Sequence, residues 1–312
     1  MHPALQCRER HRVRRLERII VGHDLRSGGA TALESTLVLA RRYEASIRLV
    51  HVIELLHHSL HVSQSKSRQS KIEERVTNSG SDLEEIVESR IDCRRRIDYE
   101  VRIGNPFFEL ILAACAWHAD LIVVGGPNRE PFHLLGSTAE RLVRKSFVPV
   151  LVTGKPLSQI AKRFLVPTDF SSEARRAAEV GITLADNFDG RIFFFHAFDP
   201  TPWYRYPYDE ETLGLMTLPE LTVDDIKDDW ASFLNRLSMA SVPWQVHTVA
   251  GRPAEMIVEY AEEIAADLII MGTHGRAGLE YILLGSVAEG VVRGASRPVL
   301  VIPPEGLQFN FL

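Results

Sequence analysis

A glycine-rich stretch near the C-terminus is the strongest candidate for chemistry in this sequence. Gly272, Gly275 and Gly285 follow a G-x2-G-x9-G spacing, and Ser286 comes directly after the last of them. Glycine lets backbone N–H groups approach an anion closely. The segment "GSVAE" is expected to open a helix, and the start of a helix favours negative charge. The stretch therefore predicts a phosphate-binding loop.

A second interpretation of the same residues needs no ligand. Ser286 and Glu289 have the S-x-x-E spacing of a capping box, which accounts for the serine. The box does not explain Gly272 and Gly275, and a helix start has several N–H groups to share with an anion. Both interpretations stay open on these residues alone.

The segment "PTDFS", Pro167 to Ser171, is a second polar loop that follows an expected strand. An Asp in this position is commonly a helix cap or the start of an Asx turn. The alternative is that Asp169 accepts hydrogen bonds from a ribose or a base. Taken alone, the residues favour the cap or the Asx turn.

The elements that would position these loops occur twice. "RIIVGHD" from Arg18 matches "RFLVPTD" from Arg163, and His51 matches His196, each expected to pack near a strand end. The two copies lie about 145 residues apart, which is far longer than a solenoid repeat. The sequence therefore predicts a duplicated domain, divided into a basic arm at 1–16, a first domain at 17–154, a linker at 155–162 and a second domain at 163–304.

Each copy alternates short apolar runs with helical patterns, as expected for βα units around a parallel sheet. Helices are expected from Pro106, from Pro253 and, through a Ser81–Glu84 capping box, from about Asp82. The strands expected in the second copy are Arg163–Thr168, Arg191–Ala197, Trp244–Ala250, Leu268–Gly272 and Pro298–Ile302. The fold class is α/β, with two tandem doubly wound domains that bind ligands beyond the carboxyl ends of their strands.

"VPTDFS", "FFFHAFD" and the run from "ADLIIMGTHG" to "RPVLVIP", with their first-half counterparts, span nearly all of both halves. Through them the chain resembles a tandem universal stress protein. The resemblance implies an adenine nucleotide alpha hydrolase-like fold, with five parallel strands in the order 3-2-1-4-5 in each half. It also implies that the last strands pair as a pseudo-dimer within the chain, and it leaves a homodimer open.

The resemblance further implies that the second domain binds ATP or AMP, together with Mg²⁺. The G-x2-G-x9-G-S pattern is the ATP-binding signature of the family's nucleotide-binding branch. The residues expected to line the adenine and ribose are Pro167, Thr168, Asp169 and Ala197. Those expected around the ribose and phosphates are Gly272, His274, Gly275, Gly285, Ser286, Val287 and Ala288.

The equivalent loop of the first half, "GGPNREPFHLLGS", departs from this pattern. It is shorter, and Asn128 stands where the second glycine is expected. Pro127 and Pro131 each remove an N–H group that would otherwise face a phosphate. We therefore expect the first domain to bind ATP weakly or not at all.

Composition limits the remaining function classes. The net charge of -5 points to no polyanionic partner, so nucleic acid is not an expected ligand. No apolar run approaches the ~20 residues that span a bilayer. The cysteines Cys7, Cys93 and Cys115 form no spaced pair, which favours a cytoplasmic setting. His57 and His61 would share a helix face, but they lack ligand-spaced neighbours, so no metal site of the protein's own is expected.

Catalytic residues are not predicted. The chain has no Walker A motif, and its glycine loop has no lysine. Phosphates without a placed base and charge clamp hydrolyse slowly. We predict an ATP-binding regulatory protein of the stress response, with an unidentified protein partner and at most slow ATP hydrolysis. The first alternative is an interaction scaffold in which the glycine loop is a relic, and the second is an enzyme that uses ATP for transfer chemistry.

Overall fold

The computed structural model describes residues 16–54, 66–89, 97–126, 138–198, 226–239, 241–273 and 285–304. The strands of the first half are β1 (Arg18–Gly22), β2 (Ser46–Ile53), β3 (Ile97–Ile103), β4 (Leu121–Gly125) and β5 (Val150–Thr153). Its helices are α1 (Ser27–Tyr43), α2 (Lys66–Ser89), α3 (Pro106–Trp117) and α4 (Thr138–Lys145).

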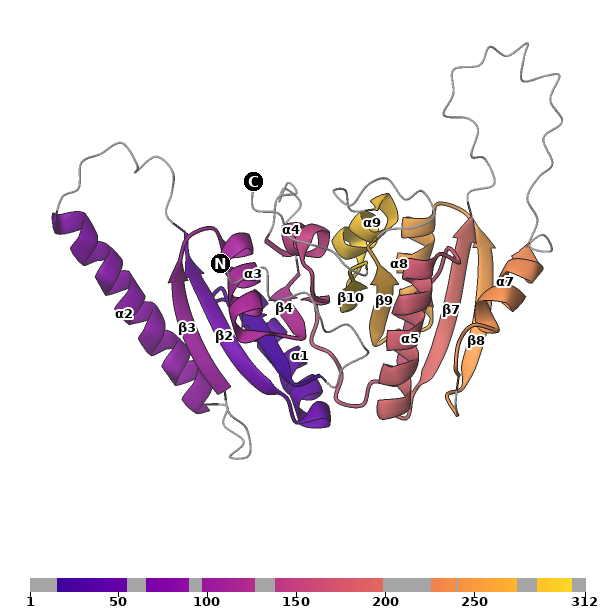
Figure 1. Cartoon of the computed structure of the whole chain (residues 1–312), viewed down its shortest axis with the longest axis horizontal. Coiled ribbons are helices and arrows are strands. Elements are labelled where there is room, and N and C mark those ends of the chain that lie inside the picture. Colours follow the sequence, from indigo (N-terminus) through magenta and orange to yellow (C-terminus); the bar gives the residue numbers. More distant parts are fainter. Residues whose placement is uncertain are drawn as a thin grey trace, which may run out of the picture.

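The second half repeats this order of elements (Figure 1). Its strands are β6 (Arg163–Pro167), β7 (Arg191–Phe198), β8 (Trp244–Ala250), β9 (Leu268–Gly272) and β10 (Val299–Ile302). Its helices are α5 (Ser172–Asn187), α7 (Lys227–Leu234), α8 (Pro253–Glu263) and α9 (Ser286–Gly294). The two halves are therefore two copies of one α/β domain, as the repeat in the sequence predicts.

The strands form one ten-stranded sheet in the order β3-β2-β1-β4-β5-β10-β9-β6-β7-β8. Within each half the strands are parallel and follow the order 3-2-1-4-5, which confirms the expected topology. The halves are joined where β5 and β10 pair antiparallel, with Leu151 opposite Leu300. The last strands of the two copies thus cover each other's edges, as expected for an intramolecular pseudo-dimer.

Helices cover both faces of the sheet (Figure 1). One hydrophobic cluster joins the sheet to α1, α2, α5 and α7, and the other joins it to α3, α4, α8 and α9. The central strands are apolar almost throughout because they are buried on both faces. Each half is therefore doubly wound, an architecture in which the crevice beyond the strand ends is open to a ligand.

The start of α2 was predicted wrongly. The helix begins at Lys66 and not near Asp82, so Ser81 lies in its interior and forms no capping box. Leu83 packs into the core, whereas most described side chains before it in this helix are exposed. The first part of α2 therefore lacks the apolar periodicity from which a helix can be recognised.

A carboxylate ties the end of α8 to the loop between α9 and β10. Glu262 accepts hydrogen bonds from the guanidinium of Arg297, at 2.8 Å, and from the hydroxyl of Ser296. The bond from Arg297, followed by that from Ser296, lowers the pKa of Glu262 below its ordinary value of 4.5. A carboxylate with a lowered pKa stabilises the fold at neutral pH, and this contribution is lost as pH falls through the folded pKa.

We expect Glu262→Gln to lower the unfolding free energy at pH 7 by less than about 1 kcal/mol, since the pair is partly exposed. The difference between variant and parent should shrink as pH falls below 4.5, where the parent carboxylate takes up a proton. Thermal unfolding across this range measures the effect, with Glu259→Gln, an exposed residue of the same helix, as the control. A difference that does not change with pH would contradict the assignment.

Candidate functional site

The strand order reverses between β6 and β9, which are parallel neighbours with Leu165 opposite Ile269. β6 ends at Pro167 and β9 ends at Gly272, so the two loops singled out in the sequence leave the sheet at the same edge. Doubly wound sheets bind ligands at this reversal point. The structure therefore brings Pro167, Thr168 and Asp169 to the same edge as Gly272.

The polar loop after β6 is a tight turn that leads into α5. Asp169 Oδ1 accepts hydrogen bonds from the N–H of Ser171, at 3.1 Å, and from its hydroxyl, at 2.6 Å. The hydroxyl of Ser171 in turn accepts from the N–H of Ala174, at 3.1 Å, and Ser171 is the N-cap of the helix. Asp169 therefore forms the Asx turn, while the cap is provided by Ser171.

Gly272 has a packing role that the sequence analysis did not identify. A Cβ atom added at this position would lie 3.2 Å from Cβ of Glu173 and 3.3 Å from its carbonyl carbon, at the start of α5. Thr273, the next residue, accepts a hydrogen bond from the N–H of Gly285 at 2.9 Å. This bond joins the two ends of the glycine loop. His274 and Gly275 lie outside the described residues.

Helix α9 begins directly after the loop, with Gly285 as its N-cap. Its first intrahelical bond runs from the N–H of Glu289 to the carbonyl of Gly285, at 3.0 Å. Helix geometry therefore leaves the N–H groups of Ser286, Val287 and Ala288 without intrahelical acceptors. These are the amides that the sequence analysis assigned to the phosphates.

The capping box expected at Ser286 and Glu289 does not form. Ser286 is the first residue of the helix and not its N-cap, and the helix has no side-chain cap. The Glu289 carboxylate instead accepts a hydrogen bond from Arg293, one turn later, at 2.6 Å. The capping-box interpretation of Ser286 is thus wrong, because Gly285 and not Ser286 occupies the N-cap position.

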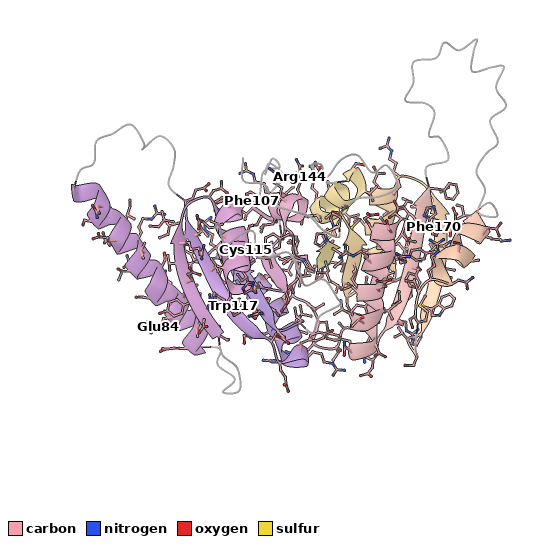
Figure 2. All side chains as sticks on the ribbon, viewed as in Figure 1. Glu84, Phe107, Cys115, Trp117, Arg144 and Phe170 are labelled. Atoms are coloured by element: carbon pink, nitrogen blue, oxygen red, sulfur yellow. The ribbon has the colours of Figure 1, made fainter. Side chains whose placement is uncertain are left out.

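An ion-pair cluster joins α9 to the first domain. Arg144 of α4, labelled in Figure 2, lies 3.6 Å from Glu289 and 3.5 Å from Glu140. Arg293 completes the cluster through its bond to Glu289. The first turn of α9 is therefore linked to the neighbouring domain by an ion pair, and the Glu289 carboxylate is neutralised by two guanidinium groups.

The equivalent edge of the first domain is built differently. Asp24 Oδ1 accepts the N–H groups of Arg26, at 2.9 Å, and Gly29, at 2.8 Å, so the carboxylate itself holds the start of α1. A Cβ atom added at Gly125 would lie only 2.7 Å from the carbonyl oxygen of Gly28. The helix start thus packs more closely on the fourth strand than in the second domain. The shortened loop, 127–137, lies outside the described residues.

His196 and Phe170 lie beside the polar loop after β6, and the sequence analysis gave neither a role there. The Nδ1 atom of His196 lies 2.7 Å from the carbonyl oxygen of Thr168, the residue before Asp169. The rings of Phe170 and His196 are 4.5 Å apart. The signal that could have revealed His196 is that a histidine and an aspartate recur together in both copies, as His51 with Asp24 and His196 with Asp169.

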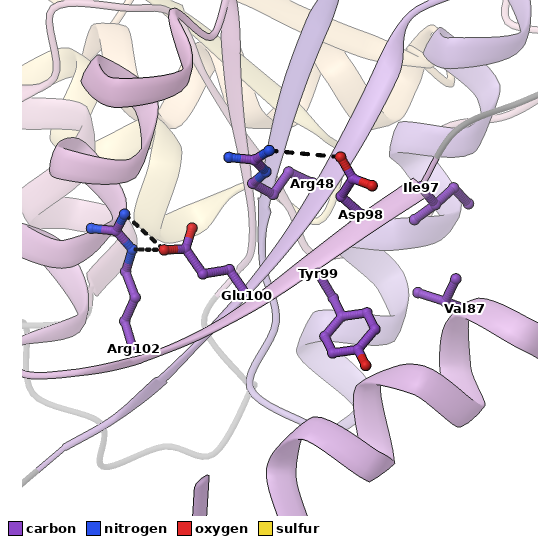
Figure 3. A pocket seen from close by; sticks show the side chains of 7 residues that line it. All are labelled: Arg48, Val87, Ile97, Asp98, Tyr99, Glu100 and Arg102. Atoms are coloured by element: carbon purple, nitrogen blue, oxygen red, sulfur yellow. Dashed lines mark hydrogen bonds and ion pairs between the residues drawn. The ribbon is translucent and has the colours of Figure 1, made fainter. Parts of the chain in front are cut away.

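Two hollows of the described surface lie away from this edge. The first, of about 420 Å³, borders β3 and the C-terminal part of α2 (Figure 3), and its cations are paired internally, Arg48 with Asp98 and Arg102 with Glu100. The second, of about 330 Å³, lies at the domain junction, where Lys162 donates to the carbonyl of Phe188. In both hollows these cations already have structural partners.

Among the described residues, no group of three or more His, Cys, Asp or Glu side chains is placed to hold a metal ion. None of the helices in the described ranges is both long and apolar enough to cross a bilayer. His57 and His61, which raised the question of a metal site, lie outside the part of the chain that the structure describes.

Two doubly wound domains with the strand order 3-2-1-4-5, joined through their last strands, define a tandem α/β protein. The model of the universal stress protein family matches residues 15–154 and again residues 161–303. The chain therefore belongs to the universal stress protein family and carries two copies of its domain.

Individual relatives support this assignment. A universal stress protein of Methanocaldococcus jannaschii is 37% identical over 145 residues, which cover 45% of this chain and 81% of that protein. One from Thermus aquaticus is 33% identical over 143 residues, covering 45% of this chain and 98% of the relative. The crystal structure of a universal stress protein from Archaeoglobus fulgidus has a TM-score of 0.65 at 22% identity and covers 93% of this chain and 97% of that chain. It shows that the tandem fold is shared.

Proposed function

We propose that the second domain binds ATP or AMP at the carboxyl ends of β6 and β9, and that the chain is a nucleotide-binding regulatory protein of the stress response. The observation that carries the proposal is the start of α9. Gly285 is its N-cap, the bond to Thr273 sets its position, and the amides of Ser286, Val287 and Ala288 lack intrahelical acceptors. Such a helix start at an order reversal is suited to phosphate.

The other site residues fit the remaining parts of a nucleotide. Pro167 ends β6 and is followed by Thr168 and Asp169. These residues would line the adenine and ribose, with Asp169 as a hydrogen-bond acceptor for a hydroxyl. Ala197 lies near the end of the neighbouring strand β7, where its backbone would face adenine. Gly272 would lie beneath the ribose and phosphates, as would His274 and Gly275. Mg²⁺ would be held mainly by phosphate oxygens and water, its usual mode of binding.

We propose a single nucleotide per chain. In the first domain, the start of the first helix packs more closely on the fourth strand, since a Cβ atom added at Gly125 would lie 2.7 Å from its nearest neighbour and one added at Gly272 would lie 3.2 Å from its own. Pro127 and Pro131 also lower the number of amides that the first loop can offer. Both differences act against binding in the first domain.

Slow hydrolysis follows from the charges around α9. Arg144 and Arg293, the guanidinium groups that contact Glu289, are held by that carboxylate. Neither of these two arginines would then be available to clamp a phosphoryl group bound at Ser286, and phosphoryl transfer is accelerated by such a clamp. The bound nucleotide would therefore act as a signal and not as a rapidly consumed substrate.

Calorimetric titration of the full chain with ATP and Mg²⁺ tests this proposal. We expect one site per chain and a turnover far below the ~1 s⁻¹ at the lower end of typical enzymes. Titration with AMP in parallel determines whether the second and third phosphates contribute to affinity. Two sites per chain would contradict the assignment of the first domain, and no binding at millimolar ATP would favour the scaffold function instead.

A further inference from the structure

We infer that His196 is a positioning residue of the nucleotide site, whose ring holds the turn that presents Asp169. The inference rests on the proposed function, because the site it serves is the one assigned to ATP. It concerns a side chain that lies on β7, outside both the polar loop and the glycine loop.

The ring of His196 forms a hydrogen bond with the backbone of Thr168, the first residue after β6. A carbonyl oxygen only accepts, so Nδ1 of His196 donates to the carbonyl of Thr168 at 2.7 Å. The N–H of Thr168 donates to the carbonyl of Phe195 at 2.8 Å. Both backbone polar groups of Thr168 are thus held by consecutive residues of β7. The backbone is thereby fixed on the N-terminal side of Asp169.

Phe170 fixes the backbone on the other side of Asp169. It has a φ of 66°, in the left-handed region that is unfavourable for a residue with a Cβ, so surrounding contacts must maintain it. Its N–H donates to the hydroxyl of Thr168 at 2.9 Å. Its ring, labelled in Figure 2, lies 4.5 Å from the ring of His196 and 5.0 Å from that of Trp230. His196 therefore contacts both neighbours of Asp169.

Trp230 connects this aromatic group to the rest of the domain. Its side chain is buried, and its indole N–H donates to the hydroxyl of Thr248 on β8 at 2.8 Å. The rings of Trp230 and His196 meet edge to face, with centroids 6.5 Å apart. His196 and Trp230 thus connect the turn that carries Asp169 to β7 and β8. A displacement of the His196 ring would therefore move the Asp169 carboxylate.

The first domain contains a matched copy of the hydrogen bond. His51 Nδ1 lies 2.8 Å from the carbonyl oxygen of His23. The N–H of His23 donates to the carbonyl of Val50. Leu25 has a φ of 57°, in the left-handed region. Leu25 stands where the second domain has Phe170, so the contact between two rings is not repeated. His51 therefore makes the same bond in the domain that is not expected to hold ATP.

The experiment compares asparagine with leucine at both histidines. Asparagine carries an N–H group near the position of Nδ1, whereas leucine has the same branched shape without a donor. We expect His196→Leu to weaken ATP binding about tenfold, since it removes the hydrogen bond and lets the turn relax. His196→Asn should recover most of the affinity, and His51→Leu should leave the dissociation constant unchanged. Calorimetry measures affinity, and thermal unfolding reports the stability of every variant.

Each outcome has a distinct meaning. If the parent chain does not bind ATP, the proposed function fails and the role of His196 fails with it. If the parent binds and His196→Leu binds equally well, the inference alone is overturned. Equal losses of affinity in His196→Leu and His51→Leu would also overturn it, because they would show a general effect on folding.

A second comparison covers the case in which His196→Leu does not fold. His196→Gln carries its donor near the position of Nε2, so it should bind ATP more weakly than His196→Asn if the bond from Nδ1 matters. Nitrogen-15 NMR of the parent protein provides a measurement without ligand. We expect the proton of the neutral His196 ring on Nδ1, and a proton on Nε2 alone would contradict the geometry on which the inference depends.

Discussion

Replacing Gly285 with valine is expected to weaken ATP binding at least about 100-fold while the second domain stays folded. The φ of -60° and ψ of 137° at Gly285 are accessible to every residue, so the backbone does not require glycine there. Valine keeps the N–H that bonds Thr273 and the carbonyl that accepts from Glu289. The expected cost in stability is therefore the modest capping difference of about 1 kcal/mol.

The loss of affinity comes from the space that phosphates would occupy. A branched side chain at the N-cap would stand in front of the amides of Ser286 and Val287. A hydrogen bond to a charged group contributes about 1.5–3 kcal/mol, so losing two accounts for a change of at least about 100-fold. Calorimetric titration with ATP measures it.

Gly294→Ala is the matched control at the other end of α9. An added Cβ there would come no closer than 3.5 Å to Val258, an ordinary contact distance. Its affinity for ATP should equal that of the parent. The assignment of the phosphates to α9 is wrong if Gly285→Val binds as tightly as this control.

The second large effect concerns stability and distinguishes the two copies at equivalent positions. Gly125→Ala should lower the unfolding free energy by about 3 kcal/mol, and Gly272→Ala by about 1 kcal/mol. The new Cβ at position 125 would meet the carbonyl oxygen of Gly28 at 2.7 Å and its carbonyl carbon at 2.8 Å. These are backbone atoms, which move only with α1. At position 272 the nearest atom, Cβ of Glu173, would be 3.2 Å away, so a small shift relieves the contact.

Denaturant unfolding of both variants measures the difference. Gly80→Ala is the control, because it lies within α2 with no atom near its added Cβ, and it should stabilise by up to about 1 kcal/mol. Equal destabilisation at positions 125 and 272 would contradict the closer packing of the first domain. A substitution at Gly285 is therefore a cleaner test of the phosphate site than one at Gly272, because a side chain at position 272 would also press against Glu173 at the start of α5.

Much of the fold follows from periodicity and from proline. The strand expected at Leu268–Gly272 is present with these bounds, and Pro106 and Pro253 begin their helices, because proline's fixed φ suits a first helical turn. The start of α2 was missed since its first part buries little apolar surface. The capping box at Ser286, one of two interpretations left open by the sequence, does not form, because S-x-x-E spacing does not reveal that Gly285 and not Ser286 is the N-cap of α9.

The contacts of the candidate site were less predictable than its place at the sheet edge. Asp169 was expected from its position after a strand, and the structure places it beside the order reversal. The bond from His196 to Thr168 depends on the register between β6 and β7 and on the left-handed φ of Phe170. Neither quantity can be read from residue types. The ion pair from Arg144 to Glu289 likewise requires the pairing of β5 with β10.

A crystal structure of the full chain with saturating ATP and Mg²⁺ tests the central claim most directly. We predict one nucleotide per chain, with its phosphates within hydrogen-bonding distance of the amides of Ser286, Val287 and Ala288 and its ribose beside Asp169. Nucleotide bound in the first domain alone, or a second-domain crevice that stays empty at millimolar ATP, would contradict the account.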